Sequence, residues 1–272
     1  MLLPRLITAI IGIPLILLSV FWGGIPFFVL MLGVVFLATR EYFILVEAKY
    51  VSQPLMGVIL GTLLFVFLFL GGTEIGALTK NQGTVAFLSL ILIPVFIVEI
   101  LKKNHQQSLE RIAITFLGIF FIPWTLGHLV LIRNLRPNGV EYVFFLFVVV
   151  WILDTGAYFI GKRFGRYKLA SNISPKKTIE GGIGGVVTGV VASILFCLFF
   201  LKDDIGIGEA AILGLIISVV SQASDLAESL IKRDVGVKDS ADLLPGHGGM
   251  LDRFDSYFFA APVLYYYLIL IR

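Results

Sequence analysis

The chain has 272 residues, of which 58% are hydrophobic, and a mean hydropathy of +0.98. Soluble domains are about 45 to 50% apolar, so this composition excludes an ordinary soluble domain and predicts an integral membrane protein. A net charge of +3 is too small to indicate a nucleic-acid partner, and the single cysteine, Cys197, excludes an intrachain disulfide.

A helix needs about 20 apolar residues to cross the hydrocarbon core of a bilayer, and about nine segments meet this length. We therefore expect an all-α, polytopic membrane protein with about nine transmembrane helices and no separate soluble domain. The expected spans are 5–23, 25–47, 54–72, 84–102, 110–132, 140–161, 182–201, 207–231 and 251–271. In this interpretation, residues 1–138 are a scaffold with an open role in oligomerisation, and residues 139–272 carry the catalytic site.

The basic residues predict the orientation in the cytoplasmic membrane. Most of the 21 Lys and Arg residues lie at the N-terminus or in the loops after spans two, four, six and eight. By the positive-inside rule, the N-terminus and both polar loops of the C-terminal half then face the cytoplasm. Charged residues of the first five spans, such as Arg40, Glu41, Glu99 and Lys102, lie near span ends, where we expect them to snorkel or to cap helices.

The sixth expected span carries Asp154 about two turns inside its C-terminal end. An unpaired carboxylate at that depth is costly, so Asp154 should face other helices and pair with a cation or a metal ion. A structural ion pair with a nearby basic residue is the alternative.

The segment SPKKTIEGG, residues 174–182, comes immediately before the seventh expected span. Thr178 and Glu180 lie near a helix N-terminus, whose free N–H groups favour anions, and Lys176 and Lys177 add positive charge. This pattern predicts a phosphate-binding segment, although the spacing of a nucleotide-binding P-loop is absent. A topology signal or a lipid-headgroup contact is the alternative.

The eighth expected span ends in a polar helical face formed by Asp225, Glu228, Ser229 and Lys232, which are spaced three and four residues apart. After a loop, Asp252 and Asp255 are also three apart and are expected to share a face at the start of the ninth span. Carboxylates from two neighbouring helices resemble a magnesium site. Salt bridges from these acids to Lys232, Lys238 and Arg253 are the alternative, and spacing does not decide between the two.

Pro245 to Gly249 form a predicted tight turn that presents His247 among glycines. We interpret His247 as a contact for a phosphate or a proton, whereas a structural or solvated histidine is the alternative. His105 and His128 lack such neighbours and are assigned no role.

Together these residues resemble the signature of the phosphatidate cytidylyltransferases, also called CDP-diacylglycerol synthases. The matching positions are Ser229, Lys232, Arg233, Lys238, Asp239, Pro245, His247, Gly248, Gly249, Asp252, Arg253 and Asp255, together with Asp154, Gly156 and the stretch 173–182. The resemblance covers the C-terminal half densely and the N-terminal half only in length and number of spans.

The resemblance implies transfer of a cytidylyl group from CTP to phosphatidate, giving CDP-diacylglycerol and pyrophosphate with Mg²⁺, a second cation being left open, and it implies a homodimer. The implied metal ligands are Asp225, Asp252 and Asp255. The implied catalytic residues are these three acids with Lys232, Arg233, Lys238, His247 and Arg253. The implied substrate-binding residues are Asp154, Lys176, Lys177, Thr178, Glu180, Ser229 and Asp239. The membrane lipid is expected to enter through a lateral cleft beside the last two spans.

Two rival functions are weighed against this one. A CTP-dependent lipid or polyprenol kinase would use similar groups but would release CDP rather than pyrophosphate. A secondary transporter would use Asp154 and Asp225 as ion-coupling residues, but it would have no use for the glycine-rich turn around His247.

Overall fold

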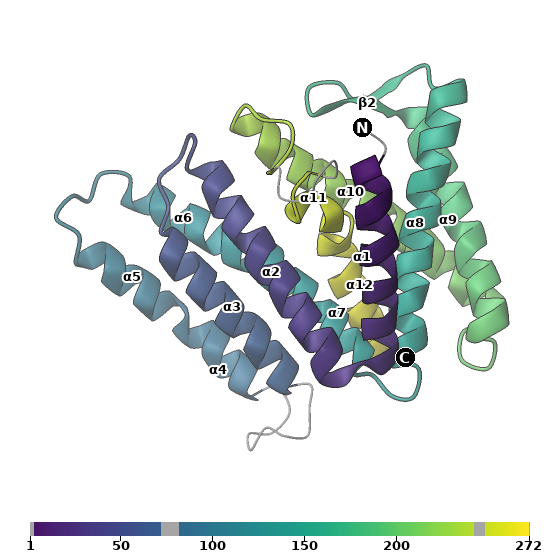
Figure 1. The fold of residues 1–272 in the computed structure, drawn as a ribbon, viewed down its shortest axis with the longest axis horizontal. Helices are drawn as coiled ribbons and strands as arrows, with labels where there is room; N and C mark the ends of the chain where they lie inside the picture. The colour runs from purple at the N-terminus through teal and green to yellow at the C-terminus, as the bar shows by residue number, and fades with distance from the viewer. Residues whose placement is uncertain (1–2, 72–81, 242–247, 272) are drawn as a thin grey trace. The chain divides into compact units, whose positions relative to one another are not determined.

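The computed structural model describes residues 3–71, 82–241 and 248–271, which form helices and one two-stranded hairpin (Figure 1). The elements are α1 (Leu3–Trp22), α2 (Gly24–Val46), α3 (Pro54–Gly71), α4 (Gln82–Leu90), α5 (Leu92–Ile100), α6 (Ser108–Ile119), the π-helical η1 (Phe120–Trp124), α7 (Thr125–Arg133), α8 (Gly139–Phe164), β1 (Lys168–Ala170), β2 (Ser174–Thr178), α9 (Ile179–Phe200), α10 (Ile207–Asp234), α11 (Leu251–Phe254) and α12 (Tyr257–Leu270).

Six helical segments of the described chain are long and apolar enough to cross a membrane. They are Gly24–Val46, Pro54–Gly71, Ser108–Arg133, Gly139–Phe164, Ile179–Phe200 and Ile207–Asp234. These segments confirm the prediction of a helical integral membrane protein, whereas the number of nine spans remains a prediction.

The other three expected spans correspond to α1 and to two interrupted helix pairs. The run between α4 and α5 breaks at Ile91, and the run between α11 and α12 breaks at Asp255 and Ser256. The expected continuous helix over 251–271 is therefore wrong at its start. Because α11 ends at Phe254, Asp252 and Asp255 do not share the helical face that their spacing predicted.

The chain divides into two compact units, each of which is made of two separate segments of the sequence. The first unit contains Met1–Asn134 and Asp234–Phe254, and the second contains Leu135–Arg233 and Asp255–Arg272. Part of the C-terminal polar stretch therefore folds together with the N-terminal helices. The functional division at residue 138 remains a prediction.

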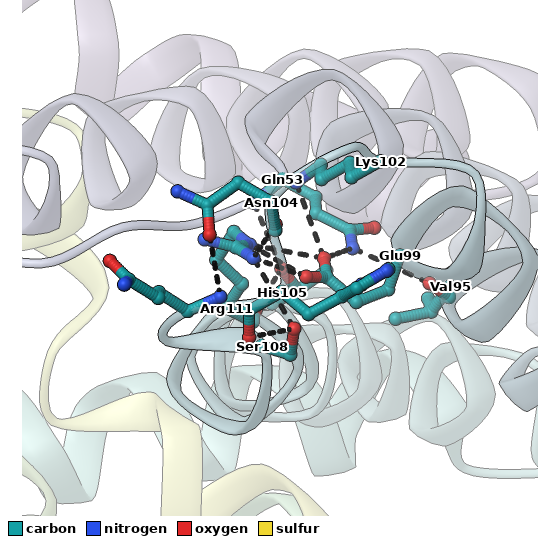
Figure 2. A network of polar contacts seen from close by, with 10 residues as sticks. Gln53, Val95, Glu99, Lys102, Asn104, His105, Ser108 and Arg111 are labelled. Carbon is teal, nitrogen blue, oxygen red and sulfur yellow. Dashed lines mark hydrogen bonds and ion pairs between the residues drawn. The ribbon is translucent and has the colours of Figure 1, made fainter.

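The first unit has an apolar core and a buried ionic network. Leu60, Leu64 and Leu68 of α3 pack with Ile91, Val95 and Ile119, all of them buried. At one side, the single Nε–H of Arg111 is shared between the two carboxylate oxygens of Glu99, at 2.9 and 3.1 Å, and Arg111 Nη2 also donates to Glu99 Oε1. Figure 2 shows Gln53 and Lys102 converging on the same carboxylate, at 2.9 and 3.3 Å. Glu99 is only 4% exposed, so of the two expectations for it, snorkelling and helix capping, snorkelling is wrong.

In the second unit, α8 and α9 lie side by side along much of their length (Figure 1). Their backbones approach closely because α9 presents glycines to α8. A Cβ atom added at Gly181 would lie 2.8 Å from the carbonyl oxygen of Ala157, and one at Gly185 would lie 3.1 Å from that of Leu153. The start of α9 is thereby fixed against α8, and the hairpin that leads into α9 is fixed with it.

Candidate active site

The hairpin replaces the loop that was expected between the sixth and seventh spans. Strands β1 and β2 are antiparallel, with Lys168 opposite Thr178 and Ala170 opposite Ser174. The buried Thr178 caps α9, since its Oγ1 accepts a hydrogen bond from the amide of Gly181 at 3.1 Å. This cap places Lys177, the residue before it, at the junction of strand and helix.

Glu180 holds the segment that follows α8. Its carboxylate accepts hydrogen bonds from the backbone amides of Arg166, at 3.0 Å, and Tyr167, at 3.3 Å. Hydrogen bonds donated by backbone amides stabilise a charged carboxylate, so these contacts favour the ionised side chain. The role that the structure supports for Glu180 is to shape the hairpin, and its expected part in substrate binding remains a prediction.

Lys177 and Asp225 form an ion pair between β2 and α10. The distance from Lys177 Nζ to Asp225 Oδ2 is 2.5 Å, and about a quarter of each side chain is exposed. Ser229 Oγ, one turn further along α10, lies 3.4 Å from Asp225 Oδ1 and donates to it. The salt-bridge alternative is thus present in this structure: Asp225 pairs with Lys177, which is distant in the sequence, and Glu228 pairs with the expected Lys232.

A second ion pair is buried one turn along the same helix. Lys232 Nζ lies 2.5 Å from Glu228 Oε2, and the two residues are 8% and 1% exposed. Sequence analysis placed Glu228 on the polar face of this helix but assigned it no site role. Its buried contact with Lys232, one of the expected catalytic residues, adds Glu228 to the candidate site.

Asp255 lies just before the last helix, α12, and is held against α10. The hydroxyl of Ser224 on α10 donates to the backbone carbonyl of Asp255, and the amide of Ser256 donates to the Asp255 carboxylate at 2.6 Å. The charges of Asp154, Asp225 and Glu228 all act on Asp255. We call Asp154, Asp225, Glu228 and Asp255 the acidic cluster; all four belong to the second unit.

The chemistry of the acidic cluster suits a divalent cation. Lys177 pairs with Asp225 and Lys232 pairs with Glu228, so two negative charges of the acidic cluster remain when all four acids are ionised. Carboxylate oxygens are the ligands that Mg²⁺ prefers. Among the described residues, however, no three His, Cys, Asp or Glu side chains are close enough together to form a ready-made metal site. The donor set fits Mg²⁺ in charge and ligand type, and two of its carboxylates are engaged by lysines.

Asp252 has a different environment in the first unit. Its Oδ2 accepts hydrogen bonds from the amides of Ser240, at 3.0 Å, and Gly249, at 2.9 Å. These contacts close the loop between α10 and α11. They give Asp252 a loop-holding role in this structure, and its expected role as a metal ligand remains a prediction.

The remaining predicted residues are distributed as follows. Arg233 Nε donates to the carbonyl oxygen of Ile173 at 3.0 Å and so ties α10 to the hairpin. Lys176, Lys238, Asp239 and Arg253 are exposed. Pro245 and His247 lie outside the described residues, so the expected contact of His247 with a phosphate remains a prediction.

Comparison with known proteins defines the class to which this site belongs. Residues 3–271 match the Cytidylyltransferase family, and the chain therefore belongs to that family. It is 36% identical to the phosphatidate cytidylyltransferase of Bacillus subtilis (strain 168), over 98% of this chain and 97% of the relative. It is 34% identical to the phosphatidate cytidylyltransferase of Synechocystis sp., over 98% and 96%, and 33% identical to that of Staphylococcus saprophyticus, over 96% of each chain.

Proposed function

We propose that this protein transfers a cytidylyl group from CTP to phosphatidate, giving CDP-diacylglycerol and pyrophosphate for phospholipid biosynthesis. The observation that carries the proposal is the similarity, over nearly the whole length of both chains, to relatives named phosphatidate cytidylyltransferase. The acidic cluster and its two lysines support it, because carboxylates that could bind a cation and ammonium groups that could bind phosphate belong to one helical unit.

The reaction joins two polyanions, so charge neutralisation is its main requirement. The phosphomonoester of phosphatidate has a second pKa near 6 and is already largely ionised at neutral pH, so no strong general base is needed. A phosphate oxygen of the lipid attacks the α-phosphorus of CTP, a new P–O bond forms, and the bond from the α-phosphorus to the bridging oxygen breaks. Pyrophosphate leaves with the electron pair of that bond.

The ion pair of Lys177 with Asp225 suits this chemistry, because it joins a proposed phosphate contact to a proposed ligand of a divalent cation. Lys177 and Lys232 can exchange a carboxylate partner for a phosphate oxygen, and Arg233, Lys176 and Lys238 are the further phosphate contacts proposed. Asp225 and Asp255, with Asp252 as the third proposed ligand, would hold Mg²⁺, which would neutralise the triphosphate and the leaving pyrophosphate. These residues would thus bring the two substrates together and orient them in line.

The proposal also covers the location, orientation and oligomeric state of the enzyme. The concentration of basic residues in the hairpin and beside α10 supports a cytoplasmic membrane protein whose N-terminus and active site face the cytoplasm. A homodimer and lateral entry of the lipid beside α10 and α12 are further parts of the proposal.

The test uses the full chain purified in detergent, with CTP labelled in its α-phosphate and with phosphatidate. We expect label in CDP-diacylglycerol together with an equal amount of pyrophosphate, both dependent on added Mg²⁺. Release of CDP with an unlabelled lipid product would instead identify a CTP-dependent lipid kinase. Absence of any CTP conversion, with ion-driven solute uptake in proteoliposomes, would identify a transporter.

A further inference from the structure

A buried glutamate of the N-terminal half holds the loop that leads into the C-terminal signature residues. Glu41 lies on α2 and is 4% exposed. Its Oε1 accepts a hydrogen bond from the amide of Met250 at 2.9 Å, and its Oε2 accepts one from the amide of Leu251 at 2.8 Å. All of these residues belong to the first unit. Because Glu41 is buried, the expectation that it snorkels is wrong, whereas its hydrogen bond with the first amide of α11 agrees with the other expectation, helix capping.

The other end of the same loop meets Glu41 through Ser240. The hydroxyl of Ser240 lies 3.1 Å from Glu41 Oε2 and 3.0 Å from Asp252 Oδ2, and it can donate its one hydrogen to either carboxylate. Asp252 also accepts the amides of Ser240 and Gly249. Two carboxylates from distant parts of the sequence therefore fix the first and last residues of the loop against α2.

Gly249 leaves the space that this arrangement needs. A Cβ atom added there would collide with Ser240 Oγ and with the Glu41 carboxylate. Any side chain at this position would have to displace one of the two groups that hold the loop. The second glycine of the Gly248–Gly249 pair is thus explained by the close approach of Glu41.

The hydrogen-bond partners of Glu41 indicate the role of its negative charge. The ion pairs found in the described part of the chain do not include it; its donors are two backbone amides and one hydroxyl of the loop. A carboxylate inside an apolar helix is costly unless hydrogen bonds offset its desolvation. Here every hydrogen bond that does so comes from the loop, so the carboxylate and the loop conformation depend on each other.

We propose that Glu41 is a positioning residue for catalysis: it fixes Ser240, Met250 and Leu251 so that the neighbouring signature residues, Lys238–Asp239 and Asp252–Asp255, are held for the reaction. The proposal rests on the cytidylyltransferase function proposed above. Glu41 touches neither substrate in this account, and it acts through the loop backbone.

The test is Glu41→Gln in the full-length protein. The amide keeps the size of the side chain, but its nitrogen cannot accept a hydrogen bond, so at least one of the three donors loses its partner. A small displacement of reacting groups lowers turnover strongly, so we expect kcat to fall about 10- to 100-fold while KM for CTP and for phosphatidate changes less than about threefold. Glu41→Asp, which keeps the charge, should recover part of the loss.

Hydrogen–deuterium exchange supplies a readout that does not depend on activity. The amides of Met250 and Leu251 should exchange faster in Glu41→Gln than in the natural protein, with the rest of α2 unchanged. Glu47→Gln is the matched control, because Glu47 follows α2 directly, is exposed and undergoes the same chemical change. It should leave both kcat and exchange unaltered.

Natural kcat and natural exchange in Glu41→Gln would overturn the proposal, as would a rise in KM with kcat unchanged. If Glu41→Gln cannot be purified, Ser240→Ala decides the matter, since it removes one donor from the loop without placing a new group in the helix. Lower kcat with faster exchange at Met250 and Leu251 supports the proposal, and natural values refute it. Failure of the natural protein to form CDP-diacylglycerol would instead reject the proposed function, and the exchange data would still report whether Glu41 orders the loop.

Discussion

Replacing Glu99 by Gln should destabilise the first unit without changing the catalytic properties of the molecules that remain folded. Glu99 accepts hydrogen bonds from Nε and Nη2 of Arg111 and one from Gln53 at 2.9 Å, and it forms an ion pair with Lys102 at 3.3 Å (Figure 2). Arg111 is only 9% exposed, so the substitution leaves a guanidinium without its counter-charge in a place that water barely reaches.

The size of the effect follows from these contacts. Removal of one partner of a buried ion pair costs about 3 to 5 kcal/mol, because the other charge stays buried. The hydrogen bond from Gln53 adds about 1 kcal/mol, and the partly exposed Lys102 adds little. Arg111 keeps two neutral acceptors, the carbonyl oxygen of Asn104 at 3.1 Å and Ser108 Oγ at 3.4 Å, which offset part of the loss. We expect a net loss of about 3 kcal/mol.

The assay is equilibrium unfolding in mixed micelles with increasing denaturing detergent, combined with the specific activity of the folded fraction. The double variant Glu99→Leu with Arg111→Leu serves as the control, because it removes both charges and should be destabilised less than the single variant. The reasoning would be refuted if Glu99→Gln lay within about 1 kcal/mol of the natural protein, or if the double variant were the less stable of the two. A lower specific activity of folded Glu99→Gln would show that this network serves more than stability.

Three further substitutions test the candidate site. Asp225→Asn should raise the Mg²⁺ concentration for half-maximal activity at least about tenfold, because it removes one charge from the acidic cluster; an unchanged Mg²⁺ titration would exclude Asp225 as a ligand. Lys177→Met should raise KM for CTP about tenfold, which steady-state kinetics at saturating phosphatidate will measure; an unaltered KM would mean that Lys177 only neutralises Asp225. Gly249→Ala should lower kcat about tenfold or more, whereas Gly206→Ala, where an added Cβ meets nothing within 4 Å, should leave kcat as it is.

The sequence predicts the positions of the helices well, because an apolar segment long enough to cross a bilayer can satisfy its backbone hydrogen bonds there in few ways other than a helix. The expected span 140–161 became α8, Gly139–Phe164, and the span 207–231 became α10, Ile207–Asp234. The breaks at Ile91 and between Phe254 and Tyr257 were missed, because an interrupted helix is as apolar as a continuous one. The hairpin 168–178 was also missed, since its charged residues resemble those of any cytoplasmic loop.

The site was predicted in its composition but not in its pairing. Asp225 and Asp154 were expected to need cations, yet nothing in the spacing distinguishes Lys177 from the other basic residues as the partner of Asp225. Glu41 shows the same limit more clearly. Its neighbours in the sequence are those of an ordinary span end, and only its contacts with Ser240, Met250 and Leu251, all distant in the sequence, reveal what it does.

The glycines of α9 have a consequence for how the chain is assembled during synthesis. Five of the 22 residues of this helix are Gly, and each lowers intrinsic helix stability by about 1 kcal/mol relative to Ala. Much of the stability of α9 must therefore come from its close contact with α8, which leaves the ribosome first. We expect the translocation machinery to release these two helices into the lipid as a pair, so that the hairpin between them is already folded when the last helices arrive.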